Sequence, residues 1–214
     1  PFVKRVQFTG ITNENTAAGS RRRLSKAVNF NHGAAATQIN QLNGSILHDS
    51  GFRGENIHIA VLDAGFLNVD LNPAFDSLRM ENLLLGTKDF VNPASNIYDE
   101  DPHGAYVLSS MTGNIPGKYI GTAPRASYLL LRTEADEGEY LCEPDFWVSG
   151  IEYADSAGVD LATTSLGYTQ FDDSTMNYTY ADMDGKTARA SIAATMAFRK
   201  GIMLLNSAGN DGGY

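Results

Sequence analysis

Three polar residues stand at the ends of apolar or helical segments, where their side chains could cooperate in proton transfer. Asp63 follows the apolar run 57–62, and Gly65 then turns the chain. Its carboxylate could orient a neighbouring base. His103 opens a segment of helical period, and an imidazole can take and return a proton near neutral pH. Asn210 lies in a small-residue loop after another apolar run, where its amide could donate to a developing oxyanion.

Each of these motifs also has a plain structural explanation. Asp63 could cap its own turn, and Asn210 could be an ordinary turn residue in a glycine-rich loop. Their order favours the chemical interpretation. Acid, then base, then amide donor, each at the end or start of an element, matches one of the known chain orders of the Ser-His-Asp triad.

The elements that must position these residues follow from the hydrophobic pattern. Continuous apolar runs alternate with segments of helical period, which predicts a parallel sheet covered on both faces. The four clearest strands are expected at 57–62, 127–131, 159–163 and 202–206.

Three helices are expected between the strands. The first begins at His103, and Gly113 is interpreted as its left-handed C-cap. The second has Pro144 in its first turn and ends at Gly158, and the third runs from about residue 186 to Gly201. Their apolar faces are expected to bury Ala105, Leu108 and Met111, then Trp147, Ile151 and Ala154, then Ala188, Ile192 and Met196.

Repeated strand-helix-strand units with short right-handed crossovers define an α/β fold with a doubly covered, mostly parallel sheet. Ligands of such sheets bind beyond the carboxyl ends of the strands. The chain has 214 residues, of which 43% are hydrophobic, so it can bury the core of one ordinary domain.

Composition and charge exclude several classes of partner. With 16 Lys and Arg against 25 Asp and Glu, the net charge of −9 disfavours binding to nucleic acid or an anionic membrane. No apolar run approaches the roughly 20 residues that span a bilayer, and the first residues lack a signal-peptide pattern. A single cysteine, Cys142, predicts a packed or idle thiol, because nothing beside it in sequence would stabilise a thiolate.

Other polar clusters are interpreted as structural, so we expect no metal site and no cofactor. The stretch 182–185 lacks the spacing and terminal Glu of an EF-hand and fits a turn before a helix. His48 and His58 have no second ligand at metal-like spacing. Tyr168, Tyr178 and Tyr180 favour packing over recognition.

Several segments together resemble the subtilisin-like serine peptidases, in family order from about residue 29 onward. The stretch from Asn31 through Gly54 into the run 59–65 resembles the start of the mature domain and its aspartate motif. The other matching segments are His103-Gly104, Gly121-Thr122-Ala123-Pro124, Ser165-Leu166-Gly167 and Ser207-Ala208-Gly209-Asn210.

The resemblance implies roles for the matching residues. Asp63 would orient the imidazolium, His103 would act as general base and then acid, and Asn210 would donate to the oxyanion. Ser165, Leu166 and Gly167 would bind an extended peptide through its backbone. Ser207, Ala208 and Gly209 would line the first side-chain pocket.

Two departures from the family pattern stand out. Ala64 replaces the Ser or Thr that often supports the aspartate, so another donor must satisfy Asp63 if it is buried. The stretches 72–75 and 113–117, which correspond to a calcium site of several subtilisins, contain no carboxylate. That site is therefore not expected here.

The resemblance implies a secreted or periplasmic serine endopeptidase, with residues 1–28 as a prodomain-like strand and linker and residues 29–214 as the N-terminal part of the catalytic domain. The serine motif is missing, so the chain alone is expected to be inactive and to need a downstream segment or chain as partner. Protein or peptide is the expected substrate. A non-catalytic peptide-binding module and a metallohydrolase using Asp63 and His103 are the alternatives.

Overall fold

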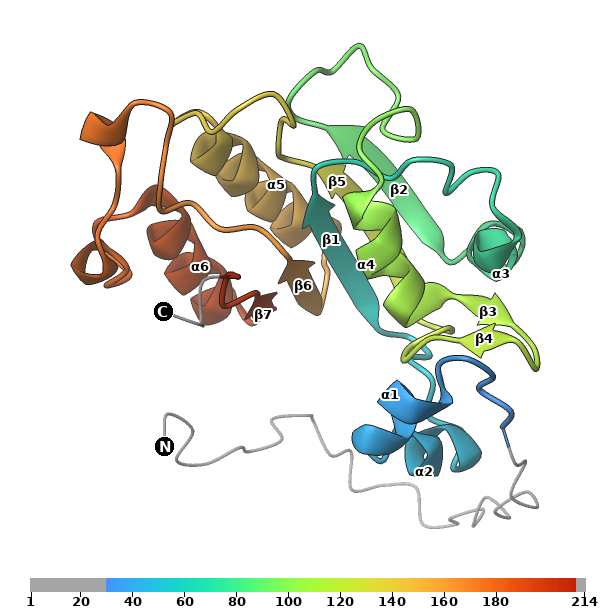
Figure 1. The fold of residues 1–214 in the computed structure, drawn as a ribbon. Helices are drawn as coiled ribbons and strands as arrows, with labels where there is room; N and C mark the ends of the chain where they lie inside the picture. The colour runs from blue at the N-terminus through green and yellow to red at the C-terminus, as the bar shows by residue number, and fades with distance from the viewer. Residues whose placement is uncertain (1–29, 211–214) are drawn as a thin grey trace.

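Five parallel strands form the central sheet of the computed structural model, which describes residues 30–210 (Figure 1). The strand order is β2-β5-β1-β6-β7. The strands are β1 (His58–Asp63), β2 (Leu84–Asp89), β5 (Ser127–Arg132), β6 (Leu161–Thr164) and β7 (Met203–Asn206). A separate antiparallel pair consists of β3 (Asn114–Ile115) and β4 (Tyr119–Ile120).

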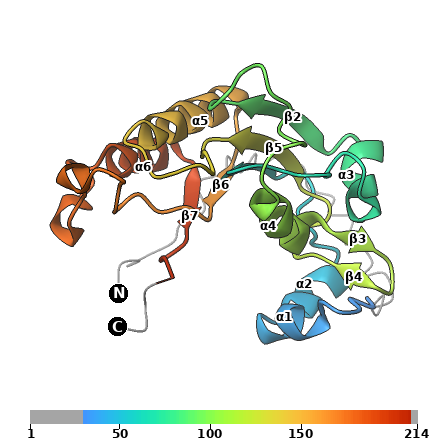
Figure 2. The ribbon, with the colours of Figure 1, turned by 45° about the horizontal axis from the view of Figure 1, so that its top comes forward.

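Helices cover both faces of this sheet (Figure 2). On one face lie α3 (Asp76–Met80) and α4 (His103–Thr112), and on the other lie α5 (Glu143–Ala157) and α6 (Arg189–Lys200). Two short helices, α1 (Ala36–Gln41) and α2 (Gly44–Asp49), precede the first strand. Three single turns of 3₁₀ helix complete the elements: η1 (Pro73–Phe75), η2 (Ser174–Met176) and η3 (Tyr180–Asp182).

Residues 59–62 of the central strand β1 are all apolar because helices cover both faces of the sheet. Ile59 and Val61 pack into the core beneath α3 and α4, whereas Ala60 and Leu62 pack into the core beneath α5 and α6. Because successive side chains of a strand point to opposite faces, the middle of a strand covered on both sides is apolar at every position. The predicted α/β architecture is thus confirmed.

All four predicted strands are present, within about two residues of their expected bounds. Sequence reasoning missed β2. This strand lies at the edge of the sheet, and its side chains are mostly half-buried or exposed. Gly86 and Lys88 interrupt its apolar pattern, so it lacks the continuous run that identifies a strand buried on both faces.

Two details of the expected helices are wrong. Gly113 follows α4 with φ −49°, so it is no left-handed cap. A Cβ there would lie 2.5 Å from the Tyr119 ring, so close packing is what requires glycine. In α6 the buried residues are Ala193 and Ala197, while Ile192 and Met196 are exposed. Alanines at these positions let the helix approach the sheet more closely than the larger side chains would.

The predicted buried face of α5 is confirmed, since Trp147, Ile151 and Ala154 are buried and Gly158 ends the helix with φ 73°. The expected strand and linker at 1–28 lie outside the described residues. Among the residues that the structure describes, no helix is long and apolar enough to cross a membrane.

Candidate active site

Asp63 and His103 meet at the carboxyl edge of the sheet. Asp63 is the last residue of β1 and His103 the first residue of α4. The imidazole Nδ1 lies 2.7 Å from Asp63 Oδ1, within hydrogen-bonding distance. The aspartate side chain is fully buried, whereas half of the histidine side chain is exposed. One ring nitrogen is therefore held by a buried acid while the ring itself faces solvent.

Two glycines permit this close approach of strand and helix. A Cβ on Gly104 would lie 2.3 Å from the carbonyl oxygen of Gly65 and 2.8 Å from Asp63 Cβ. A Cβ on Gly65 would lie 2.4 Å from the amide nitrogen of Asp101. Side chains at either position would push the helix away from the aspartate. The glycines after Asp63 and His103 thus set the distance between acid and base.

Asp63 obtains its support from the backbone. Its Oδ1 accepts hydrogen bonds from the amide of Ala64, at 2.9 Å, and from His103, while its Oδ2 has no partner among the described residues. Burial raises the pKa of Asp63 above its ordinary value, and the two hydrogen bonds oppose that rise. A backbone N–H thus supplies the donor that Ala64 lacks in its side chain.

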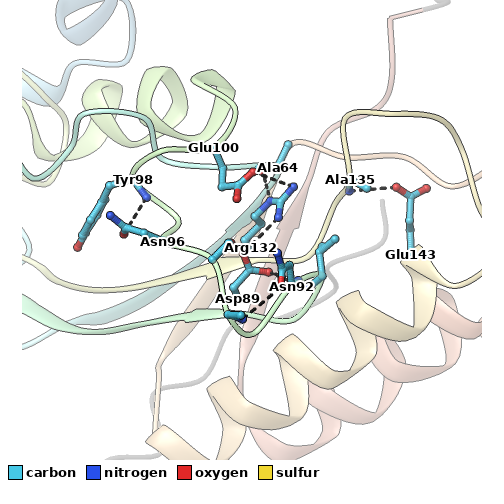
Figure 3. A network of polar contacts seen from close by, with 12 residues as sticks. Ala64, Asp89, Asn92, Asn96, Tyr98, Glu100, Arg132, Ala135 and Glu143 are labelled. Carbon is cyan, nitrogen blue, oxygen red and sulfur yellow. Dashed lines mark hydrogen bonds and ion pairs between the residues drawn. The ribbon is translucent and has the colours of Figure 1, made fainter.

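A buried arginine, Arg132, supports the turn at residues 63–65 through a hydrogen bond to its backbone (Figure 3). It is the β5 residue paired with Asp63, and its Nε donates to the Ala64 carbonyl at 2.8 Å. Its other nitrogens lie 3.2 Å from carboxylate oxygens of Asp89 and Glu100. Sequence reasoning missed this residue. The only signal was a charged residue directly after the apolar run 128–131.

The two segments expected to bind substrate lie side by side. Ser165, Leu166 and Gly167 follow β6, and the Ser207 hydroxyl donates to the Leu166 carbonyl at 3.2 Å. A cavity of about 250 Å³ opens beside them. Its walls are mainly apolar and include Trp147, Leu166, Gly167, Tyr178, Ala194 and Leu204.

Asn210 lies four residues beyond β7 and is exposed, as are Ser207, Ala208 and Gly209. Among residues 30–210 no hydrogen bond fixes its amide. The structure therefore joins Asp63 to His103 by direct contact, whereas no hydrogen bond within residues 30–210 links Asn210 to either of them.

Three other polar residues considered in the sequence fit the structural interpretation given to them there. Cys142 is exposed and unpaired. The side chain of Asp184 accepts from the amides of Lys186 and Thr187, which is the turn expected before α6. His48 is buried between His32 and the carbonyl of Thr122.

A buried acid and a half-exposed imidazole thus meet at the carboxyl edge of a doubly covered parallel sheet. Comparison with known proteins gives the family. Residues 54–213 match the model of the subtilase family, and the chain belongs to that family. The predicted resemblance is confirmed.

Individual relatives agree with this assignment. The chain is 28% identical over 178 residues to Subtilisin E of Bacillus subtilis (strain 168), covering 81% of this chain and 39% of that protein. It thus spans well under half of the relative's length. Among solved structures, the Prenylagaramide maturation protease PagA matches 75% of this chain and 48% of its own at TM-score 0.50 and 24% identity.

A second solved structure, MycP1 from Mycobacterium smegmatis, matches 83% of this chain and 45% of its own, with TM-score 0.55 and 18% identity. At these identities the structural matches establish the fold alone.

Proposed function

We propose that this chain is the acid-base half of a serine endopeptidase that hydrolyses peptide bonds with an Asp-His-Ser triad. The observation that carries the proposal is the 2.7 Å contact between Asp63 Oδ1 and His103 Nδ1. Family membership supports serine peptidase chemistry in general. The individual roles are those that the family resemblance implies, and the contact between Asp63 and His103 supports two of them.

In this proposal His103 takes the proton from the attacking serine hydroxyl and later returns it to the leaving amine. Asp63 accepts the hydrogen bond from Nδ1, which fixes the tautomer with a free Nε2 and stabilises the imidazolium that forms. The buried position of Asp63 strengthens this interaction, because little solvent screens it. Asn210 donates its side-chain amide to the oxyanion of the tetrahedral intermediate.

Substrate would bind along the segment Ser165–Gly167 as an added strand, through backbone hydrogen bonds. Ser207, Ala208 and Gly209 would line the pocket of the side chain before the scissile bond. The hydrogen bond between Ser207 and Leu166 supports a common site for both segments.

The nucleophile is expected beyond residue 214, in a downstream segment or chain. The family serine stands in a Gly-Thr-Ser motif, and the Gly-Thr pairs at 86–87 and 121–122 continue differently. Ser109 and Ser110 lie on α4 itself, where their hydroxyls donate to carbonyls of their own helix. The exposed apolar side chains of Met203 and Leu205 on the edge strand β7 support further sheet structure beside it.

A non-catalytic relative that keeps the cleft as a peptide-binding module is the second candidate, because the sequence of residues 1–214 contains no Gly-Thr-Ser motif. A fluorophosphonate applied to the complete protein separates the two. Covalent labelling of one serine supports the peptidase, and absence of labelling with retained peptide binding supports the module. Activity that a chelator abolishes and a fluorophosphonate spares would instead indicate a metallohydrolase.

We also propose that the complete protein acts in an extracellular or periplasmic compartment. The family resemblance supports this location. Fractionation of the producing cells tests it, and recovery of the protein only from the cytoplasmic fraction would contradict it.

A further inference from the structure

A group of carboxylates with no established role lies between β5 and α5. We define the acidic cluster as Glu134, Glu139 and Glu143, which belong to the connection between these elements and to the first turn of α5. One carboxylate oxygen of each residue lies within 4.8 Å of those of the other two. Carboxylates at such distances repel one another unless a cation or a proton lies between them.

Glu143 is the most deeply buried member of the acidic cluster, and two hydrogen bonds fix its carboxylate. It is fully buried, and its two carboxylate oxygens accept hydrogen bonds from the amides of Ala135, at 3.1 Å, and Tyr140, at 2.9 Å. Figure 3 shows the first of these bonds. Each oxygen keeps a second lone pair for another partner. The loop therefore folds around an oxygen ligand whose position is already set.

Glu134 provides a second, independent observation. It is only 9% exposed, yet its Oε2 is buried without a hydrogen-bond partner among the described residues. The hydroxyls of Thr133 and Tyr168 near it are likewise buried and lack a hydrogen bond of ordinary geometry. Tyr168 lies close enough to Glu134 and Thr133 to interact with both, but none of the three makes a hydrogen bond of good geometry, and a cation beside Glu134 would satisfy its oxygen.

The charge around the acidic cluster is uncompensated. No lysine, arginine or histidine within 30–210 forms an ion pair with its three members. A fourth carboxylate, Asp172, adds to the negative potential at Glu139 and Glu143.

We propose that Glu134, Glu139 and Glu143 bind a calcium ion. Asp172, in a neighbouring loop, adds negative charge near the ion without being one of its three proposed ligands. All the donors are oxygens, which hard cations prefer, and Ca²⁺ accepts six to eight of them in flexible geometry. Glu139 is exposed and would close the site from the solvent side. The buried positions of Glu134 and Glu143 favour a small ion over the long basic side chain of a substrate.

A cation here would stabilise the catalytic edge of the sheet. The amide of Thr133, the residue before Glu134, donates to the Asp63 carbonyl at 3.0 Å. The loop that the ion would hold thus begins beside the aspartate strand. The site differs from the stretches 72–75 and 113–117 considered in the sequence, and it departs from the expectation that the chain holds no metal.

The test uses the complete protein, stripped with a chelator and titrated with Ca²⁺ by calorimetry, with Tb³⁺ luminescence as a second measure. Glu134→Gln and Glu139→Gln remove one ligand charge each, and Glu137→Gln, an exposed change in the same loop, is the matched control. We expect wild type and Glu137→Gln to bind one more equivalent of Ca²⁺ than Glu134→Gln. In Glu139→Gln we expect affinity to fall by at least about 10-fold, the loss usual even for outer-sphere partners.

Unchanged stoichiometry and affinity in both ligand variants would overturn the proposal. Glu139 is exposed, so its variant gives a valid result even if Glu134→Gln fails to fold. A loss of kcat/KM only for peptides with Lys or Arg, with Ca²⁺ binding unchanged, would assign the acidic cluster to a substrate side chain instead. These binding measurements do not depend on peptidase activity, so the proposed function and the calcium site can fail separately.

Discussion

The two corners of the candidate site differ in how firmly the described residues hold them. The Asp63–His103 corner lies at the end of the central strand and is fixed by glycine contacts, a buried hydrogen bond and the Arg132 ion pairs behind it. The Asn210 corner follows the edge strand β7, whose side chains are mostly exposed. The Asp63–His103 contact is therefore complete within this chain, whereas the Asn210 corner, the proposed oxyanion donor, needs neighbouring structure to become rigid.

The largest expected effect is on the firmly held corner. In the complete protein, His103→Ala or Asp63→Ala should lower kcat/KM by about 10⁴-fold or more, a magnitude known for subtilisins and carried over here. The melting temperature should change by only a few degrees, roughly, because these groups serve chemistry more than packing. Peptide hydrolysis and thermal unfolding measure the two quantities. Unchanged turnover in either variant would remove the pair from the mechanism.

The second effect concerns the exposed corner. Asn210→Leu should lower kcat by about 10²- to 10³-fold with little change in KM, again a magnitude carried over from subtilisin, because the amide bonds the oxyanion and not the ground-state carbonyl. Steady-state kinetics measures both constants. A raised KM with normal kcat would mean that Asn210 only binds substrate.

A pair of glycine variants compares the packed Asp63–His103 corner with the open segment after β6. In Gly104→Ala the new Cβ meets backbone 2.3 Å away, whereas in Gly167→Ala it meets nothing within 4 Å. We expect the first change to lower the free energy of unfolding by about 1–3 kcal/mol, the range for overpacked sites, and the second to leave it nearly unchanged. Denaturant unfolding measures both. Equal effects would contradict the account of Gly104 as a spacer.

The smallest expected effect is on how stability depends on pH, and it concerns His32, which lies away from both corners. His32 Nε2 lies 2.9 Å from His48 Nδ1, and His48 Nε2 lies 2.9 Å from the Thr122 carbonyl. Because a carbonyl only accepts, neutral His48 carries its proton on Nε2 and accepts from His32. Burial and the neighbouring His48 lower the pKa of His32, against a smaller opposing effect of Asp49.

The sign of this effect follows from proton binding. Below the ordinary pKa of about 6.5, the unfolded chain binds a proton at residue 32 more readily than the folded one, so stability is lost as pH falls through that value toward the folded pKa. Melting temperatures between pH 7 and pH 5 should therefore decline more steeply in wild type than in His32→Gln, which keeps a donor but does not titrate. Parallel declines would exclude this role for His32.

The sequence predicted the parts of the fold whose patterns are continuous. The buried strands and the helix that starts at His103 follow from apolar runs and helical period, and the resemblance to the subtilisin-like peptidases implied that Asp63 and His103 meet. Sequence reasoning failed where tertiary packing determines which residues are buried or paired. The edge strand β2 has a mixed apolar and polar pattern, and α6 buries alanines in place of its larger side chains. The ion-pair partners of Arg132 are Asp89 and Glu100, which lie far from it in the sequence.

The acidic cluster shows the same limit of local pattern. Glu134, Glu139 and Glu143 have no metal-binding spacing in the sequence, and only the turn that returns the chain from β5 to α5 brings them together. Motif reasoning examined the stretch 182–185 instead, where the acidic side chains accept hydrogen bonds from nearby backbone amides.

The central claim is that this chain supplies the acid and the base while its nucleophile lies beyond residue 214. Its most direct test expresses residues 1–214 alone and together with the downstream segment, and measures fluorophosphonate labelling of both. We predict stoichiometric labelling of one serine in the combined protein and none in the isolated chain, with peptide cleavage following the label. Stoichiometric labelling of the isolated chain, or no labelling of the combined protein, would contradict the account.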